Sequence, residues 1–319
     1  MDQNSVFDRH NLRRKLRFWR IATLIVVLVI IGSIFLTQND DIISGDHIAR
    51  VEISGVIQDD DELISRLDGI ADDDYAKALI LTISSPGGTT YGGERIYKAI
   101  KRVSEKKPVV ADIRTLAASA GYMIAAGSDH IVAGETSIVG SIGVIFQYPQ
   151  VSELLEKIGV SYEEIKSSPL KAEPSPFHPA SDEAVAMINS MVTDSYDWFV
   201  DLVAENRNLT RAETLKVADG SIYTGRQGLE NKLIDSLGGE AEIRAFLETK
   251  DISKDLEIIE RRKPRVPQAP FLSGSIDNII HKLLGFDHEI TQNWLKDQKL
   301  FLDGLLSVWQ FGNSTQQQH

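Results

Sequence analysis

A single hydroxyl, that of Ser119, lies in a run of small residues, LAASAGYM at positions 116–123. Small neighbours leave room for a substrate backbone to approach the hydroxyl of a nucleophile, although close packing alone would also favour them. Ser119 follows the predicted strand 108–114 at about the point where the next helix starts. A side chain there lies at the positive end of a helix dipole, which favours a developing oxyanion. Ser119 is therefore a candidate nucleophile.

A serine nucleophile needs a group that accepts its proton, and two kinds of residue are candidates. Of the seven histidines, only His178 in PSPFHPAS is placed where it could reach a cleft, so a Ser-His-Asp triad stays open. Lys166 and Lys171 lie around a turn in YEEIKSSPLKAEPSPF, residues 162–177. A lysine becomes a usable base when burial lowers its pKa from about 10.4 by several units.

A glycine-rich loop, SSPGG at 84–88, follows the predicted strand AKALILTIS at 76–84. Two glycines can expose consecutive backbone N–H groups and permit positive φ angles. At the C-terminal end of a sheet strand, such a loop can form an anion site. An ordinary Pro-Gly turn would have the same sequence pattern.

Strands and helices alternate along the chain, which predicts an α/β fold with a mostly parallel sheet. The strand at 76–84 is almost continuously apolar, as expected for a strand that is buried on both faces. A long helix is predicted over 181–206, with Ser181 as its N-cap. The other predicted strands are 47–57, 108–114 and 130–146 with turns, and the other predicted helices are 62–73, 94–107 and 151–159.

The composition excludes several kinds of site and partner. The chain of 319 residues contains no cysteine, so disulfides, zinc–thiolate sites and a cysteine nucleophile are excluded. Its formal net charge is −12, and the first twenty residues are basic, so the remainder is more acidic than the whole. Phosphate contacts are made mostly by Lys and Arg, so nucleic acid is not an expected partner.

A basic segment at 1–20 precedes an uncharged apolar run over 21–36. We expect a transmembrane signal anchor at 21–37 rather than a cleaved secretory signal, because the run is long and no A-x-A-like site follows it. The positive-inside rule then places residues 1–20 in the cytoplasm of a bacterial cell and the rest outside the inner membrane, in a periplasmic or extracytoplasmic position. A polar tether at 38–46 leads to the soluble domain at 47–260. A Pro-rich linker and an amphipathic extension make up 261–319, which either packs on this chain or a neighbouring subunit, or reaches the membrane or a partner's cleft.

Four motifs occur in an order and spacing that resemble the signal peptide peptidase A family in its short, membrane-anchored form. They are SSPGG, AASAGYMIAAGSDHIVAGETSIVGSIGVI, IKSSPLKAEPSPF and IYTGRQGLENKLIDSLGG. The resemblance covers residues 47–250. It implies a ClpP/crotonase-like fold, Ser-Lys protease activity on hydrophobic signal peptides, and a ring- or bowl-shaped homo-oligomer. It leaves open whether one chain or two supply the serine and the lysine of a site.

The resemblance also implies roles for five residues. Ser119 matches the nucleophile and Lys171 the general base. Ser141, in GSIGV, matches a serine that hydrogen-bonds the lysine amine. Gly88 matches an oxyanion-hole donor, with the N–H of Ala120 as the second donor. Ala120 itself replaces a glycine that is frequent in the family.

The implied mechanism is acyl transfer and needs no metal or cofactor. Lys171, neutral, takes the proton of Ser119, whose Oγ attacks the scissile carbonyl while the Gly88 and Ala120 N–H groups hold the oxyanion. Two other functions stay open. A crotonase-type acyl-CoA enzyme would share the fold but use carboxylate bases, and a non-catalytic membrane scaffold would retain the fold without needing Lys171.

Overall fold

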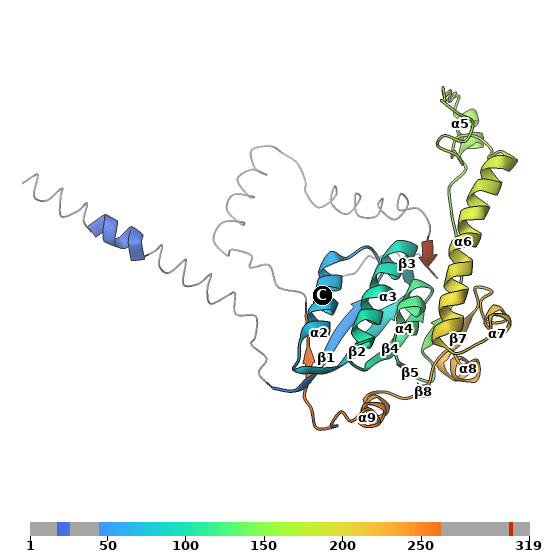
Figure 1. Cartoon of the computed structure of the whole chain (residues 1–319). Coiled ribbons are helices and arrows are strands. Elements are labelled where there is room, and N and C mark those ends of the chain that lie inside the picture. Colours follow the sequence, from blue (N-terminus) through green and yellow to red (C-terminus); the bar gives the residue numbers. More distant parts are fainter. Residues whose placement is uncertain (1–17, 26–44, 263–305, 309–319) are drawn as a thin grey trace, which may run out of the picture. The chain divides into compact units, whose positions relative to one another are not determined.

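The computed structural model describes residues 18–25, 45–262 and 306–308 (Figure 1). Residues 46–262 and 306–308 belong to one compact unit, and residues 18–25 form a helix in another. Within these described ranges, no helix is both long and apolar enough to cross a membrane. The predicted span 21–37 continues past residue 25 into positions outside the described residues. The predicted tether before residue 45 and most of the predicted extension after residue 262 also lie outside the described residues.

The compact unit is built on a mixed eight-stranded sheet. Its strands are β1 (His47–Ser54), β2 (Ala76–Ser85), β4 (Val109–Ala118), β5 (His130–Ala133), β6 (Ile138–Gly140), β7 (Ile222–Thr224), β8 (Ser236–Leu237) and β9 (Ile258–Glu260). Their order is β7-β6-β4-β2-β1-β9, with β5 between β4 and β8. Every pairing is parallel except that of β6 with β7. The predicted α/β class with a mostly parallel sheet is confirmed.

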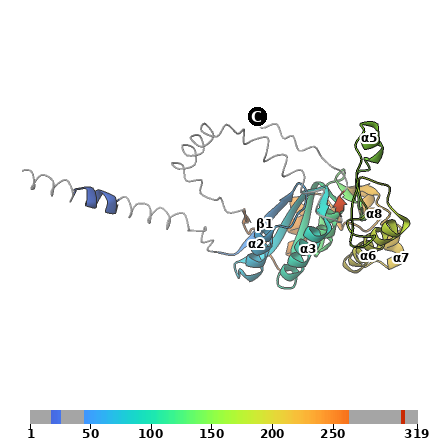
Figure 2. The same ribbon diagram turned by 90° about the horizontal axis from the view of Figure 1, so that it is seen from above.

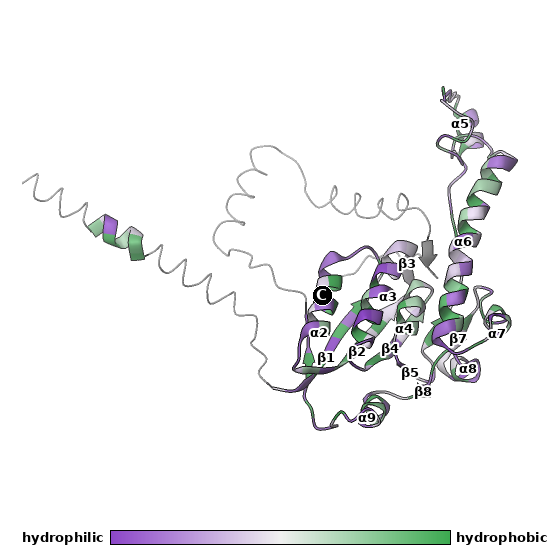
Figure 3. Ribbon diagram, viewed as in Figure 1, coloured by the Kyte–Doolittle hydropathy of each residue, from purple (hydrophilic) through white to green (hydrophobic). Residues whose placement is uncertain are grey.

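Helices cover both faces of this sheet. They are α2 (Asp61–Asp72), α3 (Thr90–Ser104), α4 (Ala120–Ala126), α5 (Ser152–Lys157), α6 (Asp182–Asn206), α7 (Arg211–Leu215), α8 (Gly225–Glu230) and α9 (Glu240–Glu248). The larger apolar core joins one face to α2, α3, α4 and the end of α6, and a smaller core joins the other face to α9. Along β2, Leu79 and Leu81 enter the larger core and Ile80 the smaller one, which explains the continuous apolar run. Figure 3 shows hydrophilic turns along α3 and none on α4, which is buried throughout.

A projecting segment, residues 145–183, departs from this compact pattern and is called the arm below. It contains α5, a loop without regular structure, and the entry to α6. Across these 39 residues only Ser175 is buried. Figure 1 shows α5 beyond the end of α6 that is remote from α4, and Figure 2 shows α5 well away from α2 and α3. The arm therefore lacks an apolar core of its own within this chain.

Candidate active site

Ser119 sits at a strained turn between β4 and α4. Its φ angle is 57° and its ψ angle −121°, a conformation that costs a non-glycine residue about 1–3 kcal/mol. The surrounding backbone fixes it: the Ser119 N–H donates to the Gly140 carbonyl at 2.8 Å, and the Met123 N–H donates to the Ser119 carbonyl at 2.9 Å. The residue is 1% exposed. A sharp strand-to-helix turn of this kind presents the nucleophile in α/β hydrolases.

The small residues around Ser119 let α4 pack against its neighbours without a gap. A Cβ on Gly121 would lie 2.8 Å from the Ser85 carbonyl oxygen, so only glycine allows this approach of α4 to β2. Tyr122, fully buried, donates from its hydroxyl to the Leu233 carbonyl at 2.7 Å. The IYTGRQGLENKLID stretch, which contains Leu233, thus supports α4. The close packing expected of LAASAGYM is present and fixes the serine, and the role of Ser119 as a nucleophile stays a prediction.

Gly88 lies on a short strand rather than in the Pro-Gly turn that its sequence also allowed. This strand, β3 (Gly87–Thr89), contacts α4. The Ile57 N–H donates to the Gly87 carbonyl at 2.8 Å, and the Thr89 N–H donates to the Ile57 carbonyl at 2.9 Å. Successive residues of a strand direct their polar groups to opposite edges. The N–H of Gly88 therefore faces the edge away from Ile57, where an oxyanion donor must be free to act.

The C-terminal extension occupies that edge. Three of its residues form β10 (Leu306–Val308), which pairs antiparallel with β3, and Ser307 lies opposite Gly88. This pairing uses the β3 backbone in the way that an extended peptide substrate would use it. A peptide that binds along β3 must therefore displace β10.

Removal of residues 263–319 is expected to lower KM for an extended peptide by roughly 3–10-fold, because an intramolecular competitor for β3 is lost. The kcat should change little, since the truncation ends after β9 and leaves the described core intact. Steady-state kinetics of the full and truncated chains give both constants. An unchanged KM would show that peptides do not bind at this edge of β3.

Ser141 directly follows β6, the strand that pairs with the end of β4 just before Ser119. Ala118 is paired with Gly140 between β4 and β6, so the two serines follow paired positions. Ser141 also has a positive φ, 51°, and its N–H donates to the Ser221 carbonyl at 2.7 Å. Ser119, Ala120 and Ser141 thus lie around the junction of β4, β6 and α4, and Gly88 lies on β3, which contacts α4.

Lys171 is placed elsewhere, exposed in the loop of the arm. The buried residues near the C-terminal end of α6 begin at Phe199, seventeen residues after Asp182, which corresponds to about 26 Å along the helix. The chain that carries Lys171 joins α6 at the far end. The structure of a single chain therefore does not bring the predicted base to the predicted nucleophile, and the pairing stays a prediction.

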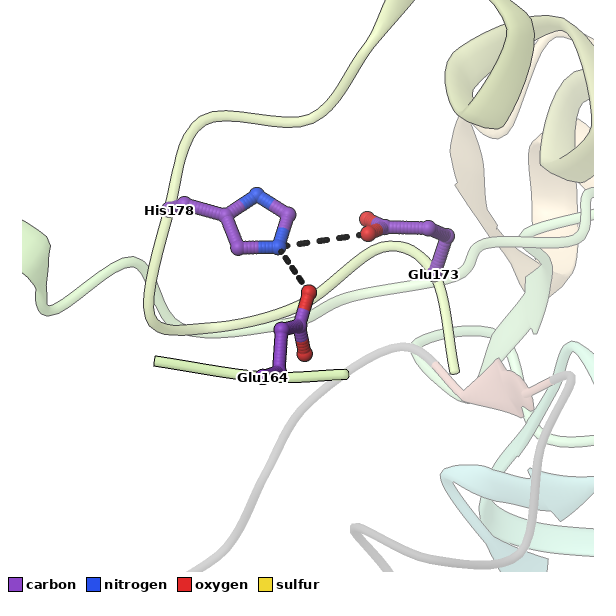
Figure 4. A group of neighbouring side chains, drawn as sticks. All are labelled: Glu164, Glu173 and His178. Carbon is purple, nitrogen blue, oxygen red and sulfur yellow. Dashed lines mark hydrogen bonds and ion pairs between the residues drawn. The ribbon is translucent and has the colours of Figure 1, made fainter. Parts of the chain in front are cut away.

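A cluster of charged side chains lies on both sides of Lys171 in the same loop, and sequence reasoning did not find it (Figure 4). Nε2 of His178 lies 3.0 Å from Glu164 Oε1 and 3.2 Å from Glu173 Oε1. The Lys166 ammonium contacts both carboxylates. One ligand atom of each carboxylate and of the imidazole lies within 4.8 Å of the others, but the Lys166 ammonium already balances their charge, so these residues form an ion-pair cluster and not a cation site. In this structure Lys166 supplies the positive charge between them.

The other described histidines have structural surroundings. His130 stacks on Phe246 with 4.3 Å between ring centroids, and burial lowers its pKa. His47 is buried near Asp73 and Arg261 at the start of β1. His178 belongs to the arm, so the triad alternative gains no support from its position.

An α/β sheet with a buried serine at a strained strand-to-helix turn is the arrangement of a serine hydrolase. Residues 101–252 match the model of peptidase family S49. The chain is 40% identical over 225 residues to a Synechocystis protein named as a protease, covering 69% of this chain and 81% of that one. It is 33% identical over 254 residues to a protein of Methanocaldococcus jannaschii named as a protease, covering 75% and 80% of the two chains. A protein of Enterococcus faecium named as signal peptide peptidase SppA is 35% identical over 231 residues, 68% of this chain and 67% of that one. The chain belongs to peptidase family S49 and is a serine peptidase similar to signal peptide peptidases.

Proposed function

We propose that the protein is an endopeptidase that cuts hydrophobic signal-peptide remnants, with Ser119 as nucleophile and Lys171 as general base. The strained turn that fixes Ser119 at the start of α4, a helix that contacts β3, is the observation that carries this proposal. The name of the Enterococcus faecium relative supports signal peptides as substrates.

The reaction proceeds through an acyl-enzyme. A neutral Lys171 amine takes the proton of Ser119 while Oγ attacks the scissile carbonyl. The N–H groups of Gly88 and Ala120 stabilise the oxyanion. The ammonium of Lys171 returns its proton to the leaving amine, and water then hydrolyses the ester. Ser141 orients the lysine amine. It directly follows Gly140, which is paired with Ala118, the residue before Ser119.

The base reaches the serine of a neighbouring copy in this proposal. Lys171 lies on an exposed arm with no apolar core, and a second copy of the chain would both cover the arm and bury the amine. Burial is also what a lysine needs to act as a base near neutral pH. The exposed apolar side chains of the arm that such a homo-oligomer would cover include Tyr148, Leu154, Ile158, Val160, Ile165 and Leu170.

The N-terminal segment fits the same function. A signal anchor at 21–37 would hold the catalytic domain outside the cytoplasm, beside the inner membrane where cleaved signal peptides remain. Such a single-pass protein would meet apolar peptides close to the lipid. The acidic body is unsuited to nucleic acid.

Substitution of either member of the dyad is expected to reduce hydrolysis of a synthetic leader peptide at least 10³-fold, because proton transfer and nucleophilic attack act as one unit. Ser119→Ala and Lys171→Ala are compared with the parent by kcat/KM. Ser128→Ala, at another buried serine after α4, and Lys157→Ala, at another lysine of the arm, are the matched controls and should keep parental rates.

His178→Ala is measured beside Lys171→Ala, because only the comparison of the two variants shows whether the histidine or the lysine acts as the base. If Lys171→Ala retained the parental rate with a parental circular dichroism spectrum, the Ser-Lys dyad would be wrong. Retention of activity by Ser119→Ala would contradict the nucleophile itself.

A further inference from the structure

The loop that carries Lys171 lacks the usual means of holding a shape. Between residues 145 and 183 only Ser175 is buried, so apolar packing within the chain contributes little. The turn at Lys171 is held by its own N–H donating to the Ser168 carbonyl at 3.1 Å, and Ala172 adopts a positive φ of 62°. A residue that must meet a nucleophile within hydrogen-bond distance needs firmer support than one turn.

That support comes from the charged cluster at the two stems of the turn. Lys166 precedes Lys171 by five residues and Glu173 follows it by two, and the Lys166–Glu173 ion pair closes the segment between them. Glu164 joins the same lysine from further back in the chain. Glu173 is the most enclosed member, with a side chain only 5% exposed, and its second oxygen accepts from the Ser175 N–H at 3.0 Å.

The hydrogen bonds of His178 define its charge. Its Nδ1 lies 3.0 Å from the Pro179 carbonyl oxygen, which only accepts hydrogen bonds. Its Nε2 faces the carboxylates of Glu164 and Glu173, which accept when ionised (Figure 4). Both ring nitrogens can donate at the same time only when each carries a proton, that is, when the ring is an imidazolium. Its charge and that of Lys166 balance the two carboxylates.

We propose that Glu164, Lys166, Glu173 and His178 form a charge-neutral cluster that positions Lys171, and that the cluster is complete only while His178 is protonated. The effect on catalysis rests on the proposed function, because it requires Lys171 to be the base. These four are positioning residues, since none is placed at Ser119. Tyr162 completes the surroundings: its hydroxyl donates to Glu164 at 3.2 Å and its ring packs on Phe177, 4.4 Å between centroids.

The pH range of the cluster follows from the direction of each shift. The hydrogen bond to the Pro179 carbonyl and the Glu164 carboxylate raise the pKa of His178 above 6.5. Its stabilising contribution is therefore complete below the unfolded pKa and is lost as the pH rises through the raised value. Lys166 lowers the pKa of Glu164 and Glu173 below 4.5, so their contribution is lost as the pH falls through the lowered values. All four side chains of the cluster are therefore charged between the lowered pKa values of the two carboxylates and the raised pKa of His178.

Hydrogen exchange in the inactive Ser119→Ala protein tests the cluster without relying on catalysis. His178→Gln, which cannot be charged, is expected to speed amide exchange in residues 164–178 about tenfold and to leave α4 unchanged. With His178 present, the same acceleration should appear as the pH rises above neutrality, after correction for the intrinsic exchange rate. Glu163→Gln, at the exposed neighbour of Glu164, is the matched control and should behave as the parent.

Kinetics then test the link to Lys171. In the active protein, His178→Gln is expected to lower kcat roughly tenfold with KM nearly unchanged, and to remove the alkaline fall of the kcat–pH profile. Parental exchange and a parental profile in His178→Gln would overturn the cluster proposal. Full activity of Lys171→Ala would instead overturn the proposed dyad, while the exchange result would still stand.

Discussion

Two inactive variants are expected to restore activity to each other. When Ser119→Ala and Lys171→Ala chains are co-expressed and purified as mixed oligomers, about a quarter of the parental kcat should return, with KM unchanged. A site that takes its serine from one copy and its lysine from the next is intact only when the first copy retains Ser119 and the next retains Lys171. In a random equal mixture each condition holds for about half of the sites, so about a quarter of the sites are intact. Leader-peptide hydrolysis by the mixed oligomer, beside each variant alone, gives the measurement.

The physical basis is the separation of the two groups within one chain. Ser119 is buried where β3, β4 and α4 meet, whereas Lys171 is exposed on an arm that joins the body through the far end of α6. To bring Lys171 to Ser119 within one chain, the loop before α6 would have to refold along the helix, which is uninterrupted between Ala184 and Phe199. Contact with a second copy needs no such change.

The control is a mixture of two variants that lose the same half of the site. Ser119→Ala mixed with the double variant Ser119→Ala/Lys171→Ala should stay inactive, because no copy supplies a serine. Recovery in that mixture would reveal contaminating activity. If the complementary mixture forms oligomers but shows no recovery, the dyad is assembled within one chain and the arm must move.

Elements with strong local patterns were predicted correctly from the sequence. The helix predicted over 181–206 is α6, and the Ser181 side chain accepts from the Ala184 N–H, as an N-cap does. The apolar run at 76–84 is β2, buried on both faces. Such elements depend on residues close in the chain, so their signals are local.

Features that depend on distant pairings were not predictable. Gly87 and Gly88 have the composition of a turn. They form a strand because their backbone pairs with Ile57 on one side and with β10 on the other. The charged cluster joins residues fourteen positions apart in a segment with no periodic pattern. The candidate nucleophile was found because its motif is contiguous, but its strained backbone depends on Gly140 in another strand.

Gly88→Ala is expected to reduce kcat by about 10²–10³, the usual cost of losing one oxyanion-hole donor. A Cβ at this position would lie 1.8 Å from the carbonyl oxygen of Ile57, far inside van der Waals contact. That oxygen belongs to the backbone and accepts from the Thr89 N–H, so no side-chain rotation relieves the clash. The strand β3 must move, and the Gly88 N–H moves with it.

Gly69→Ala provides the matched control for this change. Gly69 lies on α2 with nothing within 4 Å of an added Cβ, so alanine there should raise stability by about 0.5–1 kcal/mol and leave kcat unchanged. Thermal unfolding and leader-peptide hydrolysis of both variants separate a local shift of β3 from general unfolding. A Gly88→Ala protein that unfolds at the parental temperature and keeps the parental kcat would exclude the Gly88 N–H as a donor. Ala120 would then be the one predicted donor left, and a second would have to come from another residue around α4.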